Sequence, residues 1–314
     1  MSSWSEIKRD YHATLKSSDT EEWIDLAFYR PVGYAWALLA SKIGVTPNVI
    51  TIASVFLGVG AGICFYYNDL WINICGMLLL IWANSYDSAD GQLARMTRNF
   101  SKFGRMLDGF CGDIWFVAIY LGIILRLTNT DTLFMEYKLL AWGLAALAGL
   151  FHSRQASFAD YYRNIHLYFL KGEQGSELSS YKSICERYDQ ISFKTDFWES
   201  AFLFFYRNYT RNQERTTPKF QLMMVALKER FPDGVVSEKF RNDFRAKSKP
   251  MMKYTNILSF NTRVIALFVS LFVGMPYLYF IFEIVVLNAI LIYMYLTHER
   301  FCAKFTKELN DGLY

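Results

Sequence analysis

The sequence predicts an all-α integral membrane protein with six transmembrane helices, an N-terminal interfacial helix and a cytoplasmic helical insertion. Of its 314 residues, 53% are hydrophobic, 18% are aromatic and only six are proline, which is too apolar for a soluble domain of this length. Six apolar runs are each long enough to cross a bilayer as a helix. Basic residues gather in the connections on one side of these runs.

The N-terminal juxtamembrane segment is expected at residues 1–45. From Trp23 to Ile43 its apolar and charged residues alternate, with interruptions at Pro31 and Gly33. This pattern is typical of one or two helices lying along the membrane surface, and it fits a helix packed against the protein equally well. Acidic residues occupy the region where a signal peptide would be basic, so no signal peptide is expected.

The expected spans divide the rest of the chain into transmembrane helices 1–4 within 46–160, the insertion at 161–252, helices 5 and 6 within 253–300, and a cytoplasmic tail at 301–314. Thr46-Pro47-Asn48 can open the first span, because Thr or Asn can cap a helix and proline suits its first turn. Gly58 and Gly62, four residues apart, favour close packing of that helix against a neighbour. The six spans are expected at 48–67, 70–88, 106–127, 133–156, 256–274 and 277–297.

Charge decides the expected orientation. The short connections at 68–69 and 128–132 contain no Lys or Arg, whereas the connection at 92–105 contains four basic residues. By the positive-inside rule the 92–105 end, both termini and the insertion face the cytoplasm, across the inner (cell) membrane if the protein is bacterial. The net charge of +4 predicts no nucleic-acid partner. The five scattered cysteines, with no Cys-x-x-Cys pair, predict neither a zinc site nor a disulfide framework.

Four aspartates lie at the facing ends of the second and third spans: Asp87, Asp90, Asp108 and Asp113. A carboxylate at the edge of a bilayer is costly unless it is paired, solvated or bound to a cation. Carboxylates without Cys or His favour hard ions such as Mg²⁺ or Mn²⁺ over zinc. Two ions on shared carboxylates are a common device for displacement at phosphorus. The aspartates therefore predict a site for two Mg²⁺ or Mn²⁺ ions.

The spacing Asp-x-x-Asp-Gly-x-x-Ala-Arg, eight residues, then Gly-x-x-x-Asp closely resembles the signature of the CDP-alcohol phosphotransferase (CDP-alcohol phosphatidyltransferase) family of integral membrane enzymes. The resemblance extends less specifically over about residues 40–160, and the later half of the chain matches only in hydropathy. The matching residues are Asp87, Asp90, Gly91, Ala94, Arg95, Gly104 and Asp108.

The resemblance implies a role for each matching residue. Asp87, Asp90 and Asp108 would bind the ions, together with a fourth aspartate that acts as the base toward the acceptor hydroxyl. The motif from Asp90 to Arg95, with Gly104, would form the CDP pocket, where Gly91 and Ala94 leave room for the nucleotide. The expected catalytic residues are therefore Asp113, as the base, and Asp108.

The position of the fourth aspartate departs from the family pattern. The family has aspartate where this chain has Gly112, and the available carboxylate is Asp113, one residue later. In a regular α-helix the extra residue rotates Asp113 well away from the face of Asp108. A single π-type turn, eased by Gly109 and Gly112, would restore the alignment. We expect that turn; the alternative is that Asp113 is only a charge at a helix end.

In the fourth and fifth expected spans two arginines stand out, Arg154 and Arg263. Family members with a phosphorylated sugar-alcohol acceptor have arginines on these two spans that hold the acceptor phosphate, which is the role expected here. The alternatives are an ion pair with a site aspartate and snorkelling to lipid headgroups. Glu283 is expected at the membrane interface. The aromatic and basic run at 197–215 predicts an amphipathic helix that lies against membrane or protein.

The resemblance therefore implies metal-dependent transfer of a phosphatidyl group from CDP-diacylglycerol to an alcohol such as inositol phosphate or glycerol phosphate, with release of CMP. One alternative is transfer from another CDP-alcohol to a diacylglycerol- or ceramide-type lipid. Two others are a non-catalytic membrane protein and a cation transporter. The transporter is disfavoured, because the acidic residues lie at one face of the membrane and not through its depth. The expected partners are the CDP-linked donor, the alcohol acceptor, membrane lipid and, because dimers are common in the family, a second copy.

Overall fold

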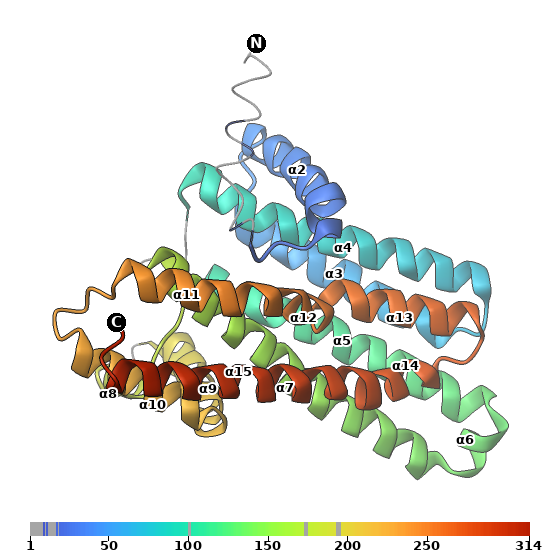
Figure 1. The fold of residues 1–314 in the computed structure, drawn as a ribbon. Coiled ribbons are helices and arrows are strands. Elements are labelled where there is room, and N and C mark those ends of the chain that lie inside the picture. The colour runs from blue at the N-terminus through green and yellow to red at the C-terminus, as the bar shows by residue number, and fades with distance from the viewer. Residues whose placement is uncertain are drawn as a thin grey trace. The chain divides into compact units, whose positions relative to one another are not determined.

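The computed structural model describes Arg9, Tyr11, Ser17 and residues 19–99, 102–172, 175–192 and 196–314, except for the side chains of residues 102, 103, 105, 106 and 108. These residues form helices joined by turns, with no β-strand among them, which confirms the all-α class (Figure 1). The chain divides into two compact units, Met1–Leu150 with Val264–Ile284 and Phe151–Arg263 with Val285–Tyr314.

The first unit is built around three long helices, α3, α4 and α5, with shorter helices before and after them. Its helices are η1 (Asp25–Tyr29), α2 (Arg30–Lys42), α3 (Pro47–Tyr66), α4 (Leu70–Thr97), α5 (Lys102–Thr130), α6 (Thr132–Glu136), the first part of α7 (Lys138–Lys171), most of α13 (Phe260–Phe272), α14 (Tyr277–Ile281) and the start of η4 (Phe282–Leu287).

The second unit contains the remainder of α7 and the expected insertion, which is helical. Its other helices are α8 (Tyr181–Asp189), α9 (Phe197–Thr216), α10 (Pro218–Arg230), α11 (Glu238–Ser248), η3 (Lys249–Met251), α12 (Met252–Ile257) and α15 (Asn288–Asn310).

Local chemistry sets where the helices of the first unit begin. Pro47 is the first residue of α3 and follows Thr46 in an extended conformation, although the Thr46 side chain does not cap the helix. The Asp69 carboxylate accepts a hydrogen bond from the Ile72 amide at 3.0 Å and so caps α4. Asp131 caps α6 in the same way.

Small residues bring α3 and α5 into backbone contact. A Cβ atom added to Gly122 would lie 2.1 Å from the Gly62 carbonyl oxygen, and one added to Gly62 would lie 2.6 Å from the Ala118 carbonyl carbon. A Cβ added to Gly58 would lie 2.1 Å from the Trp115 ring. The close packing predicted from Gly58 and Gly62 is therefore confirmed.

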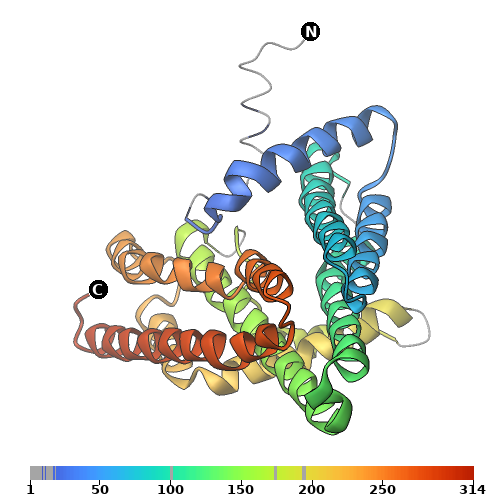
Figure 2. The ribbon, with the colours of Figure 1, turned by 90° about the vertical axis from the view of Figure 1, so that its right-hand side faces the viewer.

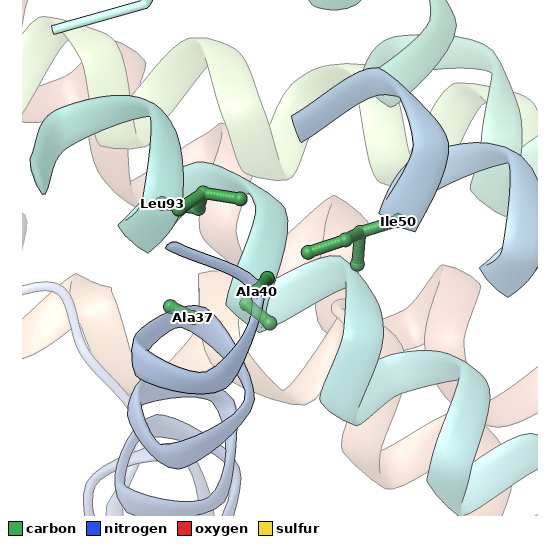
Figure 3. Packing of buried hydrophobic residues seen from close by; sticks show 5 residues of the cluster. Ala37, Ala40, Ile50 and Leu93 are labelled. Carbon is green, nitrogen blue, oxygen red and sulfur yellow. The ribbon is translucent and has the colours of Figure 1, made fainter. Parts of the chain in front are cut away.

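The N-terminal helix α2 packs against α4. Figure 2 shows α2, in blue, crossing over the end of α4, and Figure 3 shows the buried cluster at this crossing. Residues 30–42 therefore pack against the protein, and their position along a membrane surface stays a prediction. The cluster consists of Ala37, Ala40, Ile50, Ala89 and Leu93.

Within the described residues, four helical stretches are long and apolar enough to cross a membrane: Pro47–Tyr66, Gly109–Thr130, Glu238–Phe272 and Tyr277–Asn310. They correspond to the first, third, fifth and sixth expected spans and indicate an integral membrane protein. The second expected span lies within α4, whereas the fourth begins in α6 and, after the non-helical Tyr137, continues in α7. Polar side chains such as Asn73 and His152 lower their apolar character.

Glu283 was expected at the membrane interface, but its side chain is buried inside the protein. It is 0% exposed, lies in the π-helix η4 and accepts hydrogen bonds from the hydroxyls of Tyr120 and Tyr279. The expectation was wrong because the two tyrosines, on α5 and α14, supply the polar contacts that a carboxylate needs inside an apolar helix bundle.

Candidate active site

The first part of the signature lies in the last three turns of α4. Asp87 is half-buried, and Asp90 is 4% exposed. Beyond them α4 ends at Thr97, where Arg98 adopts the left-handed conformation with φ of 52°. The helix therefore stops within one turn of Arg95, so the two acidic residues lie close to a helix end.

A threonine of α3 holds Asp90. The Thr51 hydroxyl donates a hydrogen bond to Asp90 Oδ2, and Thr51 is itself 2% exposed. A hydrogen bond to the charged form stabilises a carboxylate that has lost contact with water. The sequence analysis did not identify Thr51 as a site residue. Its one signal in the sequence is a hydroxyl side chain one turn after Pro47 in an apolar helix.

A cysteine of α5 contacts Asp87. Cys111 Sγ donates to Asp87 Oδ1 at 3.0 Å, and Cys111 is 1% exposed. This contact brings α5 against the acidic end of α4, as the signature implies. Asp108 lies one helical turn before Cys111 on α5; its side chain is outside the described part of the structure. The Cys111 contact was also missed, because an isolated cysteine carries no spacing signal.

The expectation of a π-type turn between Asp108 and Asp113 is wrong. Residues 102–130 form one regular α-helix, and Asp113 on it is exposed. Gly109 and Gly112 permit such a turn, but nothing in their surroundings forces it: a Cβ added to either would meet no atom within 4 Å. In a regular helix Asp113 is about 200° round the axis from Cys111, nearly on the opposite face.

Helix α2 closes another side of α4. A Cβ added to Gly33 would lie 2.8 Å from Ser88 Oγ, and Gln92 Nε2 donates to the Arg30 carbonyl oxygen at 3.2 Å. Burial raises the pKa of the neighbouring Tyr29 phenol, and a hydrogen bond with Asn84 opposes that shift. The Ser88 and Gln92 side of α4 is thus covered by protein.

The signature residues Gly91, Ala94 and Arg95 follow Asp87 on one face of α4, at steps of four, seven and eight residues. All of them are half-buried. The Arg95 guanidinium lies over Gly91, because a Cβ added to Gly91 would be 3.5 Å from Arg95 Nη2. Gly104 is half-buried on α5.

The donor set fits a hard cation in its chemistry. Asp87 and Asp90 supply carboxylate oxygens from adjacent turns of α4, the ligand type that Mg²⁺ and Mn²⁺ prefer. Among the side chains that the structure describes, no group of three or more His, Cys, Asp or Glu residues could hold a metal ion. A third carboxylate would have to come from Asp108.

Arg154 and Arg263 belong to the second unit, whereas the signature belongs to the first. Arg154 is exposed on α7. Arg263 is 1% exposed, and its Nη1 contacts His152 Nδ1 at 3.0 Å while its Nη2 donates to Gln155 Oε1 at 2.9 Å. Its Nε and Nη2 also donate to the Leu258 carbonyl oxygen, at 3.2 and 3.1 Å. The Arg263 side chain therefore ties α7 to the break between α12 and α13.

Comparison with known proteins supports the signature independently. Residues 44–159 match the family model described as CDP-alcohol phosphatidyltransferase. A CDP-diacylglycerol–glycerol-3-phosphate 3-phosphatidyltransferase of Cereibacter sphaeroides is 37% identical to this chain over 79 residues, which are 25% of this chain and 35% of that protein. This chain thus aligns with about a third of the length of that relative.

The matched region begins just before α3 and ends within α7. It includes all of α4 and α5, and hence every residue of the signature together with Thr51 and Cys111. Residues 44–159 of this chain therefore match the domain that defines the CDP-alcohol phosphatidyltransferase family.

Proposed function

We propose that this protein transfers a phosphatidyl group from CDP-diacylglycerol to an alcohol acceptor, with release of CMP, as a step in phospholipid synthesis. The observation that carries the proposal is the meeting of three helices at the signature: Thr51 of α3 holds Asp90, and Cys111 of α5 holds Asp87. The name of the Cereibacter relative supplies the donor and suggests glycerol phosphate as one acceptor.

In this proposal Asp87, Asp90 and Asp108 would hold two Mg²⁺ or Mn²⁺ ions. When bound, such ions neutralise the negative charge of the donor pyrophosphate and of the departing CMP. The chain's own residues orient the ligands: Thr51 fixes one oxygen of Asp90, and Cys111 fixes one oxygen of Asp87. Gly91, Ala94, Arg95 and Gly104 would form the wall that faces the nucleotide.

The acceptor hydroxyl needs a base, since its pKa is far above neutral. We propose a carboxylate of α5 for this role. Asp113 is the candidate from the family pattern, but the regular helix turns it away from Cys111, so the alternative is Asp108, one turn before Cys111. Asp113→Asn separates the two assignments: it should abolish CMP release if Asp113 is the base and leave most of it if Asp108 is the base.

The expected arrangement in the membrane is part of the proposal. With six spans, α4 as the second and α6 with the start of α7 as the fourth, the positive-inside rule would put the signature at the cytoplasmic leaflet. The lipid donor then enters sideways from the bilayer, and the alcohol arrives from the cytosol. For a phosphorylated acceptor, we propose that Arg154 contacts the phosphate, while Arg263 fixes the turn of α7 that bears Arg154.

The test uses purified protein in lipid nanodiscs that contain CDP-diacylglycerol. CMP release is measured with Mg²⁺, with Mn²⁺ and with a chelator, in the presence of glycerol phosphate, inositol phosphate, inositol or serine. We expect metal-dependent release with one acceptor, and we expect Asp108→Asn to lower it by about 100-fold or more, as loss of a metal ligand or base does.

A parallel assay supplies CDP-choline or CDP-ethanolamine with diacylglycerol or ceramide. Turnover there and none with CDP-diacylglycerol would replace the proposed donor. No CMP from any donor, by protein that remains folded and monodisperse, would overturn the enzymatic proposal in favour of a non-catalytic membrane protein.

A further inference from the structure

One face of α9 exposes aromatic rings where a water-facing helix would carry polar side chains. Phe197, Trp198, Phe204 and Phe205 are 51%, 63%, 42% and 62% exposed. Their positions i, i+1, i+7 and i+8 put them on a single side of the helix. We call these four residues the aromatic face; α9 has the yellow of the colour bar in Figures 1 and 2.

The opposite side of α9 is fixed within the second unit. Ser200, Leu203 and Gln213 are buried. Gln213 Nε2 donates to the Ser157 carbonyl oxygen of α7 at 3.1 Å, and the Tyr209 hydroxyl donates to the same oxygen at 3.4 Å. Because these contacts hold the inner side, the aromatic face cannot turn inward without breaking buried hydrogen bonds.

Basic side chains continue the same side of α9 toward its C-terminal end. Arg211 and Arg215 are exposed and follow Phe204 by seven and eleven residues, which keeps them on the side of the aromatic face. The Arg207 guanidinium carbon, Cζ, lies 4.8 Å from the centre of the Tyr188 ring and 5.7 Å from the centre of the Phe204 ring. The outer surface of α9 is therefore aromatic at one end and cationic at the other.

We propose that the aromatic face lies in the headgroup region of a bilayer that contains anionic phospholipid, with Arg211 and Arg215 on lipid phosphates. Trp and Phe rings are typical of helices lying in the membrane interface, and arginine pairs well with phosphate oxygens. The chain has helical stretches apolar enough to cross a membrane, so a lipid surface surrounds it. A nucleic-acid partner fits less well, since only two exposed arginines border the rings.

The test is photo-crosslinking of the full chain in nanodiscs. Phe205 is replaced by p-benzoylphenylalanine, and intact-protein mass spectrometry measures the fraction that gains a phospholipid. Phe56, 73% exposed on the apolar helix α3, is the positive control, and the exposed Glu186 of α8 is the polar control. Neither site touches the signature contacts, so the result does not depend on the proposed transferase activity.

We expect a lipid adduct at position 205 comparable to that at 56 and well above that at 186. Replacing Arg211 or Arg215 by glutamine should lower the yield about fivefold for each in phosphatidylglycerol discs, with little change in phosphatidylcholine discs. Lysine at the same positions should restore it. A crosslinked dimer would assign this surface to a second copy, and a yield equal to that at 186 would assign it to water; either result overturns the proposal.

Discussion

One helix contact of the first unit and two of the second are held by different means. In the first unit α3 and α5 meet through glycine, so that backbone lies against backbone at Gly62 and Gly122. In the second unit the buried guanidinium of Arg263 joins α7 to the α12–α13 break by hydrogen bonds, and Glu299 of α15 accepts from the first amides of α10. The glycine contact fixes the distance between two helix axes, and the hydrogen bonds fix the orientation of one helix relative to another.

This difference suits what each unit carries. Carboxylates on separate helices can share an ion only if the helices keep a spacing defined to a fraction of an ångström, and backbone contact achieves this without adjustable side chains. A hydrogen-bonded clamp tolerates other helix spacings, but it fails when one partner is lost, because the others stay buried without it. Overpacking at a glycine contact and loss of one partner from a buried hydrogen-bond network can therefore be told apart by mutation.

The largest effect is expected for Gly122→Ala. The new Cβ atom would lie 2.1 Å from the Gly62 carbonyl oxygen, so two backbones must separate. We expect a loss of about 3 kcal/mol in unfolding free energy, the upper range for overpacking, and loss of CMP release. Thermal unfolding in detergent measures the first and the nanodisc assay the second.

Gly143→Ala is the matched control, because a Cβ there would meet no atom within 4 Å and Gly143 is also helical. It should leave the unfolding temperature unchanged or raise it slightly, since alanine favours helix over glycine by up to about 1 kcal/mol. Equal stability for both variants would show that the α3–α5 contact does not set the spacing.

Arg263→Gln is expected to have the next largest effect. It removes donors from His152, Gln155 and the Leu258 carbonyl at once, and burial leaves them no water to replace it. The unfolding free energy should fall by about 2 kcal/mol, following the cost of buried polar groups left unsatisfied. Arg154→Gln, at an exposed position of α7, should leave it unchanged.

Kinetics sharpen the same comparison. Arg154→Gln should raise the acceptor Michaelis constant if the acceptor carries a phosphate. An Arg263→Gln variant with normal stability and a raised Michaelis constant would instead show that Arg263 binds the acceptor directly, as the resemblance implied, and that the clamp contributes little.

The sequence was most informative where function depends on spacing along one helix. The residues from Asp87 to Arg95 and the Gly58–Gly62 pair lie within single helices, so their shared faces follow from helical periodicity. Contacts between distant segments carry no such signal: Arg263 and Gln155 are 108 residues apart, and Thr51 and Asp90 are 39 apart. The expected π-type turn failed for a related reason, because glycine permits a distortion without requiring one.

Thr51→Val tests whether the first unit also depends on direction at the site itself. Valine keeps the shape of threonine but removes the hydroxyl that donates to Asp90. We expect CMP release to fall about tenfold, which corresponds to about 1.4 kcal/mol, near the lower end of the range for one hydrogen bond to a charged group. Thr51→Ser should retain most activity, and equal activity in both variants would remove Thr51 from the site.

The smallest effect is expected at a helix cap in the second unit. Ser180 Oγ accepts from the Ser183 amide at 3.2 Å at the start of α8, so Ser180→Ala should cost about 1 kcal/mol, seen as faster amide exchange confined to α8. Asp69→Ala removes the corresponding cap of α4, but α4 is also held along its length by α3. Exchange in α4 should therefore change less than exchange in α8. The reverse order would mean that packing in the first unit is no stronger than the polar contacts of the second.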